Sequence, residues 1–367
     1  MSYELEVIIL AMLTAAACAL LGTFLVLRRT AMISDAISHT ILFGIVLAFL
    51  IIGDLRSPWL LVGATLTGLL TVWLVELLSR SKRVKEDTAI GLVFPLLFSL
   101  AVIMISRFAG NVHLDEHTIL LGELAFAPFD RVTLLGLDLP RGFWVMGGIL
   151  LLNGLFIGLL YKELKLSTFD AGLAAALGFA PVLLHYGLMS LVSLTAVGAF
   201  DAVGAILVIA LMIGPPAAAY LLTDRLSSML GLSVLIGMLS ALAGYGLAVA
   251  LNTTIAGAMA TMVGVSFVLV YLLAPQRGLV AGLRRRQRQR WLFAQQMLAA
   301  HLLQHEDTPE ASEECRAATL GEHLRWEPIF VAGVLQRAEQ AELVRREGDL
   351  VRLTEQGRTL AVEAMMR

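Results

Sequence analysis

Nine apolar runs constrain this chain more than any other feature of its sequence. Several exceed about 18 residues, the length that crosses the hydrocarbon core of a bilayer as an α-helix. Hydrophobic residues make up 58% of the 367 residues and charged residues 15%, which excludes a soluble enzyme of this length. The sequence therefore predicts an all-α polytopic membrane protein surrounded by lipid. The expected spans are 6–27, 33–52, 58–79, 88–106, 142–161, 182–200, 203–222, 229–250 and 255–273.

The basic residues between these spans predict the orientation of the chain. Cytoplasmic loops carry an excess of lysine and arginine. With the carboxyl-terminal tail in the cytoplasm, the inner loops hold Arg28, Arg29, Arg80, Lys82, Arg83, Lys85, Lys162, Lys165 and Arg225. The outer loops then hold Arg56, Arg107, Arg131 and Arg141. We therefore expect a multi-pass protein of the bacterial inner (cytoplasmic) membrane, with its amino terminus outside and its tail inside.

The composition changes near residue 278, which predicts a membrane domain at 1–278 and a cytoplasmic domain at 279–367. The second part is charged and helical in pattern. Its residues alternate over Leu343–Leu353 around Glu-Gly-Asp, a hairpin signal. Helices are expected at Arg288–Gln304, Thr319–Trp326, Pro328–Ala341 and Glu355–Met366. This order is typical of a small winged-helix α+β domain.

Asp35 and His39 are the first candidates for a functional site. They lie four residues apart in an apolar stretch, so a helix places them on one face. Ionisable side chains are costly in a membrane and usually line a pathway. Carboxylate and imidazole suit Mn²⁺, Fe²⁺ and Zn²⁺, whereas paired thiols for copper are missing. The alternative is that Asp35 lies near the inner interface and His39 is simply packed.

Further candidates have competing interpretations. Asp201 interrupts an apolar stretch where two spans meet, and it is either a metal ligand or a helix cap. His113, Asp115 and His117 alternate like ligands on an extended segment, but a solvated loop is the favoured interpretation. Glu123 and His185 are single polar residues and stay unassigned. In the tail, the group of His301, His305, Glu306 and His323 is interpreted as scattered surface residues rather than as a metal site.

Three segments between or within the spans are predicted to be irregular. The inner stretch 162–178 is expected to form a short helix, with Asp170 as its N-cap and Gly178 as its stop. The outer stretch Thr118–Phe129 is expected to form a short re-entrant or surface helix. Gly214–Pro216 is expected to kink or end the helix in which it lies.

The membrane part resembles the permease subunits of ABC importers for manganese, zinc and iron, most closely the manganese and iron branch. The matching stretches are Ser34–His39, Lys85–Gly91, Phe169–Asp170, Val203–Ala217 and Ala250–Ala260. The tail resembles iron- and manganese-responsive winged-helix repressors.

This resemblance implies that Asp35 and His39 contact the metal on the translocation path, as a gate completed by another subunit. It also implies a helix that couples to an ATPase, formed by Phe169, Asp170, Leu173, Leu177 and Gly178. The implied partners are an ATP-binding cassette subunit, a second permease copy or paralogue, and an extracytoplasmic metal-binding protein.

The chain has no Walker A sequence, so ATP hydrolysis is expected on a partner subunit and this chain is not expected to be an enzyme. No cofactor is expected beyond the transported Mn²⁺, Fe²⁺ or Zn²⁺. The expected recognition helix, 328–341, carries Arg337 against Glu327, Glu339 and Glu342, so nucleic acid is not an expected partner. The alternatives are a secondary metal transporter and a membrane-tethered metal-responsive regulator.

Overall fold

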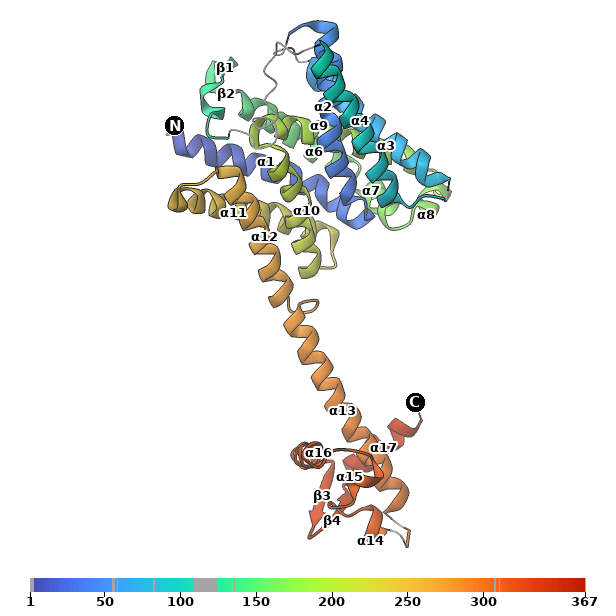
Figure 1. Cartoon of the computed structure of the whole chain (residues 1–367). Helices are drawn as coiled ribbons and strands as arrows, with labels where there is room; N and C mark the ends of the chain where they lie inside the picture. The colour runs from blue at the N-terminus through green and yellow to red at the C-terminus, as the bar shows by residue number, and fades with distance from the viewer. Residues whose placement is uncertain are drawn as a thin grey trace. The chain divides into compact units, whose positions relative to one another are not determined.

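The computed structural model describes residues 3–54, 57, 59–81, 83–108, 124–134, 136–306, 308–309 and 311–366 (Figure 1). The chain divides into two compact units, Met1–Gly278 and Leu279–Arg367. Each unit has its own hydrophobic core.

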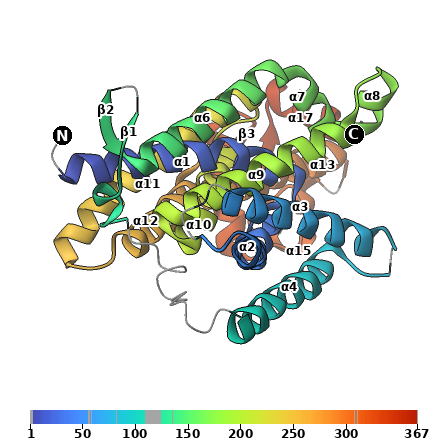
Figure 2. The ribbon, with the colours of Figure 1, turned by 90° about the horizontal axis from the view of Figure 1, so that it is seen from above.

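Within the described residues, nine helices are long and apolar enough to cross a membrane, as predicted. They are α1 Tyr3–Arg28, α2 Ala31–Ile52, α3 Trp59–Arg80, α4 Glu86–Phe108, α6 Arg141–Leu159, α9 Pro181–Val203, α10 Ala205–Leu222, α11 Leu226–Leu251 and α12 Ile255–Leu273. Helix α1 is the most buried of them and packs against α6, α9, α10 and α11 (Figure 2). Helix α2 packs between α3 and α4.

Paired polar side chains join the spanning helices inside the membrane unit. Lipid gives apolar helix faces little reason to associate, so such hydrogen bonds stabilise helix contacts, each by about 0.6 kcal/mol on average. Among the described residues, four pairs that involve only hydroxyl and amide side chains connect neighbouring helices, with donor–acceptor distances of 2.8–3.1 Å. They are Thr71–Thr40, Asn153–Thr195, Ser240–Ser266 and Thr23–Ser233.

Helix α10 does not end at Gly214–Pro216, where the sequence predicted a kink or an end. The helix runs unbroken through Pro215 and Pro216. Proline lacks the amide hydrogen, so the carbonyl of Met212 loses its partner within the helix. Gly22 of α1 lies so close that a Cβ on it would be 2.0 Å from the Met212 oxygen. Packed neighbours of this kind allow proline inside membrane helices. The chain breaks instead at Gly204, between α9 and α10, where φ is 79°.

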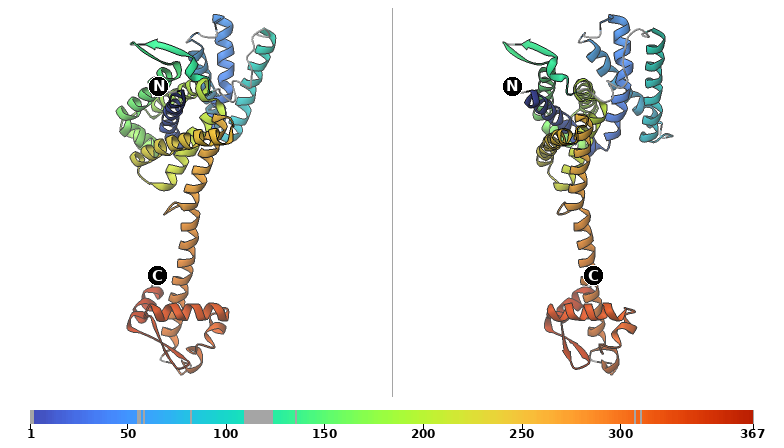
Figure 3. Two further views of the ribbon diagram at one scale, coloured as in Figure 1. Left: turned by 90° about the vertical axis from the view of Figure 1, so that its left-hand side faces the viewer. Right: turned by 60° about the vertical axis from the view of Figure 1, so that its left-hand side comes forward.

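The segment before α6, which is predicted to lie outside, contains a hairpin that was not predicted. Strands β1 Arg131–Leu134 and β2 Leu137–Pro140 pair antiparallel (Figure 3). Arg131 holds the hairpin on α1, with Nη1 3.1 Å from Oε2 of Glu6 and Nε 2.9 Å from Oδ2 of Asp138. The pKa of Arg131 is raised, mainly by its hydrogen bond to Asp138. Of the helix expected at 118–129, the described part is a turn followed by the 3₁₀ helix η1, Ala127–Phe129.

The stretch 162–178, which is predicted to lie inside, forms two helices rather than one, α7 Tyr161–Phe169 and α8 Ala171–Ala176. Asp170 separates them because its extended backbone ends α7, while its Oδ1 accepts a hydrogen bond from the Leu173 amide at 2.8 Å. Asp170 is therefore the N-cap of α8, as predicted. Gly178, with φ at 86°, follows the last turn.

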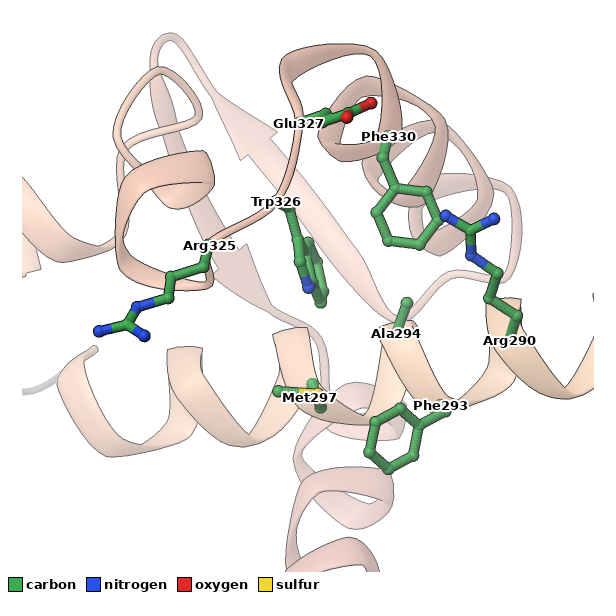
Figure 4. A pocket seen from close by; sticks show the side chains of 8 residues that line it. All are labelled: Arg290, Phe293, Ala294, Met297, Arg325, Trp326, Glu327 and Phe330. Carbon is green, nitrogen blue, oxygen red and sulfur yellow. The ribbon is translucent and has the colours of Figure 1, made fainter.

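The tail unit is built on the long helix α13, Leu279–His305, which begins nine residues earlier than the expected Arg288. Four helices and a hairpin follow: α14 Ala311–Glu314, α15 Leu320–His323, α16 Pro328–Gln340, β3 Val344–Glu347, β4 Leu350–Leu353 and α17 Glu355–Met365. The predicted hairpin is present, with Val344 opposite Leu353. Helix α13 packs against α16, β4 and α17. Figure 4 shows Trp326 and Phe330 above Ala294 and Met297, around a hollow of about 410 Å³.

Candidate functional site

Asp35 and His39 lie on one face of α2, as the spacing predicted. His39 Nε2 is 3.5 Å from Asp35 Oδ1. Nitrogen and oxygen ligands bind Zn²⁺ at about 2.0–2.2 Å, so two donors at this separation can contact one ion. The pair supplies two donors, which is fewer than the four of a closed structural site.

Helix α4 fixes the orientation of the imidazole. The ring of His39 lies 5.1 Å from the ring of Phe94 and 6.3 Å from that of Phe98, measured between centroids. Phe98 meets the imidazole edge-on, with an interplanar angle of 87°. The imidazole ring of His39 is thus packed against two phenyl rings of α4, as the alternative interpretation held. Its Nε2 atom still faces Asp35.

The pair belongs to a stripe of α2 that this chain does not bury. Met32, Asp35, His39, Phe43 and Leu47 follow at helical spacings of three and four residues, and none of them is fully buried. The side chains of Asp35 and His39 are 39% and 30% exposed, respectively. A carboxylate in contact with hydrocarbon is costly, so this stripe requires water or a second protein surface beside it.

A second polar cluster lies where α1 and α3 end and α9 begins. Glu76 on α3 is its centre, because His185 Nε2 lies 2.7 Å from Oε1 and the Tyr186 hydroxyl donates to Oε2 at 2.8 Å. Arg28 Nη1 is 3.4 Å from the other ring nitrogen of His185. Arg28 also donates to Ser167 Oγ and Thr168 Oγ1 of α7, both at 3.1 Å. The cluster therefore ties four helices together.

Sequence reasoning found this cluster only in part. His185 was noted as an unassigned inner residue, and Glu76 was missed. The available signal was a carboxylate inside the apolar run of α3, where an ionisable residue requires a partner. One partner is local, since Nη2 of Arg80, four residues on, lies 3.4 Å from Oε2 of Glu76. His185 and Tyr186 are more than 100 residues away along the chain, so the sequence does not pair them with Glu76.

The structure does not test the remaining membrane candidates. Asp201 lies in the last turn of α9, before Gly204, and its side chain is outside the described residues. His113, Asp115 and His117 also lie outside the described residues, as does Glu123.

The segment around α8 exposes apolar side chains outside the spanning helices. Phe169, Leu173 and Leu177 are exposed on and beside this short helix. Asp170 and Gly178 define its two ends. An apolar patch of this kind on a polar-flanked helix is typical of a surface that contacts another protein or a membrane interface.

In the tail, the structure contradicts the interpretation of the histidines as scattered residues. His301, His305 and His323 lie together beside Glu314, which the sequence analysis did not consider. Glu306 forms a separate ion pair with Arg358, with 3.3 Å between Oε2 and Nη2.

The arginine of the expected recognition helix is also engaged within the tail. The guanidinium of Arg337 lies over the ring of Trp291, 4.2 Å from its centroid. Arg290 of α13 lies in the same way over Phe330, at 4.5 Å. Cation–π contacts of this kind hold α16 against α13 and leave Arg337 poorly placed to bind a phosphate.

Comparisons with known proteins agree with the membrane architecture. Residues 2–274 match the model of the ABC 3 transport family. The chain is 48% identical to the zinc transport system membrane protein TroD of Treponema pallidum, over 97% of each chain. It is 50% identical to the manganese transport system membrane protein MntD of Bacillus subtilis, over 76% of this chain and 95% of that protein.

A solved structure has the same architecture. The structure titled PsaBC from Streptococcus pneumoniae in complex with Fab aligns with a TM-score of 0.64 at 27% identity. The alignment covers 76% of this chain and 94% of that one.

Proposed function

Because the chain belongs to the ABC 3 transport family, we propose that it is the permease subunit of an ATP-driven importer of divalent transition metal ions. Manganese is the proposed cargo, with iron and zinc as chemically similar cargoes. The names of the relatives support this class, since they specify manganese and zinc. As an ABC permease the chain is a transport subunit, and ATP hydrolysis lies on separate subunits.

The single observation that carries the proposed mechanism is the Asp35–His39 pair on the partly exposed stripe of α2. Two donors 3.5 Å apart can hold an ion only weakly. A second permease copy or paralogue facing the stripe would add two more donors and would cover the exposed carboxylate. The resulting four-donor ring binds an ion in one state and releases it when the two permeases separate. Transport requires that the ion leave as readily as it enters.

The energy for this separation comes from an ATP-binding cassette partner on the cytoplasmic side. The exposed side chains of Phe169, Leu173 and Leu177 are the proposed contact surface, with α8 as the coupling helix. The adjoining helix α7 is bound to α1 through Arg28, which also contacts His185 of α9. A displacement of α8 therefore reaches the inner ends of the spanning helices. An extracytoplasmic metal-binding protein delivers the ion from the other side.

The tail is proposed to be a cytoplasmic winged-helix domain with a regulatory or protein-contact role. The order of α15, α16, the β3–β4 hairpin and α17 supports this assignment. The contact of Arg337 with Trp291 argues against DNA binding by α16.

Uptake of radioactive Mn²⁺ by cells that carry the complete importer tests the gate. Asp35→Asn removes the carboxylate charge and His39→Gln removes the basic ring nitrogen, and both roughly preserve side-chain size. Uptake by each variant should fall by about 10-fold or more. Met32→Leu, an apolar change on the same stripe, is the matched control and should transport normally. Undiminished uptake by Asp35→Asn in an assembled complex would exclude the gate.

A second measurement separates an ATP-driven importer from a secondary transporter. Vanadate should stop uptake, and the ATPase should co-purify with the chain. Vanadate-insensitive uptake that follows an ion gradient would favour the secondary transporter instead.

A further inference from the structure

We propose that the tail holds a second metal site, formed by His301 and His305 of α13 and Glu314 of α14, with His323 of α15 beside it. The site would take a divalent first-row transition ion. It is distinct from the proposed path through Asp35 and His39, and nothing in the proposed transport mechanism requires it.

The geometry brings donors from two helices, α13 and α14, close together. One donor atom from each of His301, His305 and Glu314 lies within 4.8 Å of the others. His301 Nε2 is 3.6 Å from Glu314 Oε2. The two histidines of α13 are four residues apart, so their rings lie on one helix face with centroids 4.8 Å apart. Tetrahedral donors at about 2.0–2.2 Å from one metal are about 3.4 Å apart. The His301–Glu314 distance of 3.6 Å fits this, and the other donors must approach on binding.

His323 extends the donor set. Its Nδ1 lies 3.0 Å from Glu314 Oε2, and its ring stacks near that of His301 with 6.0 Å between centroids. Three imidazoles and one carboxylate suit Zn²⁺, Fe²⁺ and Mn²⁺ alike. Glu314 is thereby shared by two imidazoles, those of His301 and His323.

Partial burial favours a metal site over surface residues that are close only by chance. The side chains of His301 and Glu314 are 13% and 21% exposed, so the donors are accessible yet partly removed from water. The backbone beyond Glu314 is fixed, because Cys315 is buried in the core and its carbonyl accepts from the Val351 amide at 2.9 Å. The carboxylate is thereby held in front of α13 by the β4 strand.

Metal binding at this point would join α13, α14 and α15. Helix α15 leads directly into α16, which packs on α13 through the ring of Phe330 against Trp291, with 5.0 Å between centroids. An ion would therefore clamp the helical part of the tail onto α13. If the proposed transport function holds, the fraction of tail sites that bind metal rises with the concentration of metal imported into the cytoplasm.

Titration of the full-length protein in nanodiscs with Co²⁺, followed by its visible ligand-field absorption, tests the site. Glu314→Gln keeps the size of the side chain and should weaken Co²⁺ binding by about 10-fold or more. Glu313→Gln makes the same chemical change one residue away on an exposed side chain and should bind as the wild type does. Equal Co²⁺ binding and identical spectra for Glu314→Gln and Glu313→Gln would overturn the proposal.

Hydrogen exchange gives an independent measurement on the same samples. Zn²⁺ should slow amide exchange in α14 and α15 of the wild type and of Asp35→Asn, but not of Glu314→Gln. Unchanged exchange on adding Zn²⁺ to the wild type would refute the clamp. If Glu314→Gln alters the fluorescence of the metal-free tail, His301→Gln replaces it in both measurements.

Asp35→Asn also separates this proposal from the transport mechanism. Normal uptake by Asp35→Asn, together with loss of Co²⁺ binding in Glu314→Gln, would reject the gate and support the tail site. Loss of uptake by Asp35→Asn, with equal Co²⁺ binding in Glu314→Gln and Glu313→Gln, would support the gate and reject the tail site.

Discussion

Gly44→Ala should displace the helix that carries Asp35 and His39. Helix α2 crosses α3 at Gly44 with no room for a methyl group. A Cβ there would lie 2.4 Å from the carbonyl oxygen of Gly63 and 2.4 Å from Oγ1 of Thr67. Carbon and oxygen atoms in favourable contact are about 3.3–3.6 Å apart. The two helices must therefore separate by about 1 Å, because the Gly63 oxygen belongs to the α3 backbone and cannot rotate away.

The energetic cost follows from two opposing effects. Overpacking costs about 1–3 kcal/mol, and the upper end applies here because backbone blocks the methyl group. Replacing a helical glycine by alanine returns about 1 kcal/mol. The net destabilisation is then about 2 kcal/mol, which corresponds to a fall in the unfolding midpoint of about 4–8 °C for a unit of this size. Metal uptake should fall as well, because the donors on α2 move with the helix.

Thermal unfolding in nanodiscs and Mn²⁺ uptake, measured together, check this prediction. Gly148→Ala on α6 is the matched control, since a Cβ there meets no atom within 4 Å. It should keep or raise the unfolding midpoint and transport normally. If Gly44→Ala matched Gly148→Ala in both measurements, the close approach of α2 and α3 and the argument built on it would be wrong.

Two further predictions concern α8 and the polar cluster around Glu76. Asp170→Ala removes the N-cap of α8 and should cost about 1 kcal/mol of helix stability, so less ATPase should co-purify with the chain. Asp170→Asn keeps a capping oxygen and should retain the ATPase. Equal losses of ATPase for both variants would refute capping as the cause. Glu76→Gln and His185→Gln should each lower the unfolding midpoint, and the double variant should lose less than the sum of the two losses because the side chains share one of their interactions. Fully additive effects in this double-mutant cycle would contradict the coupling.

The sequence by itself determined the features that depend on neighbouring residues. Apolar run length set the nine spans, since a helix must satisfy its own backbone groups inside a bilayer. The i, i+4 spacing placed Asp35 and His39 on one face, and Asp170 followed by small residues marked a helix start. Alternation around Glu-Gly-Asp located the tail hairpin. In each case the deciding interaction lies within a few residues of chain.

Tertiary structure decided every feature that depends on which faces of the helices and strands pack together. It paired Glu76 with His185, and it brought Glu314 to His301, because no local pattern encodes which helix faces meet. It kept α10 helical through Pro215 and Pro216, where the sequence predicted a kink or an end. It also left Asp35 on a partly exposed stripe. Hydropathy and spacing are properties of a segment, whereas packing between segments selects the side chains that form a site.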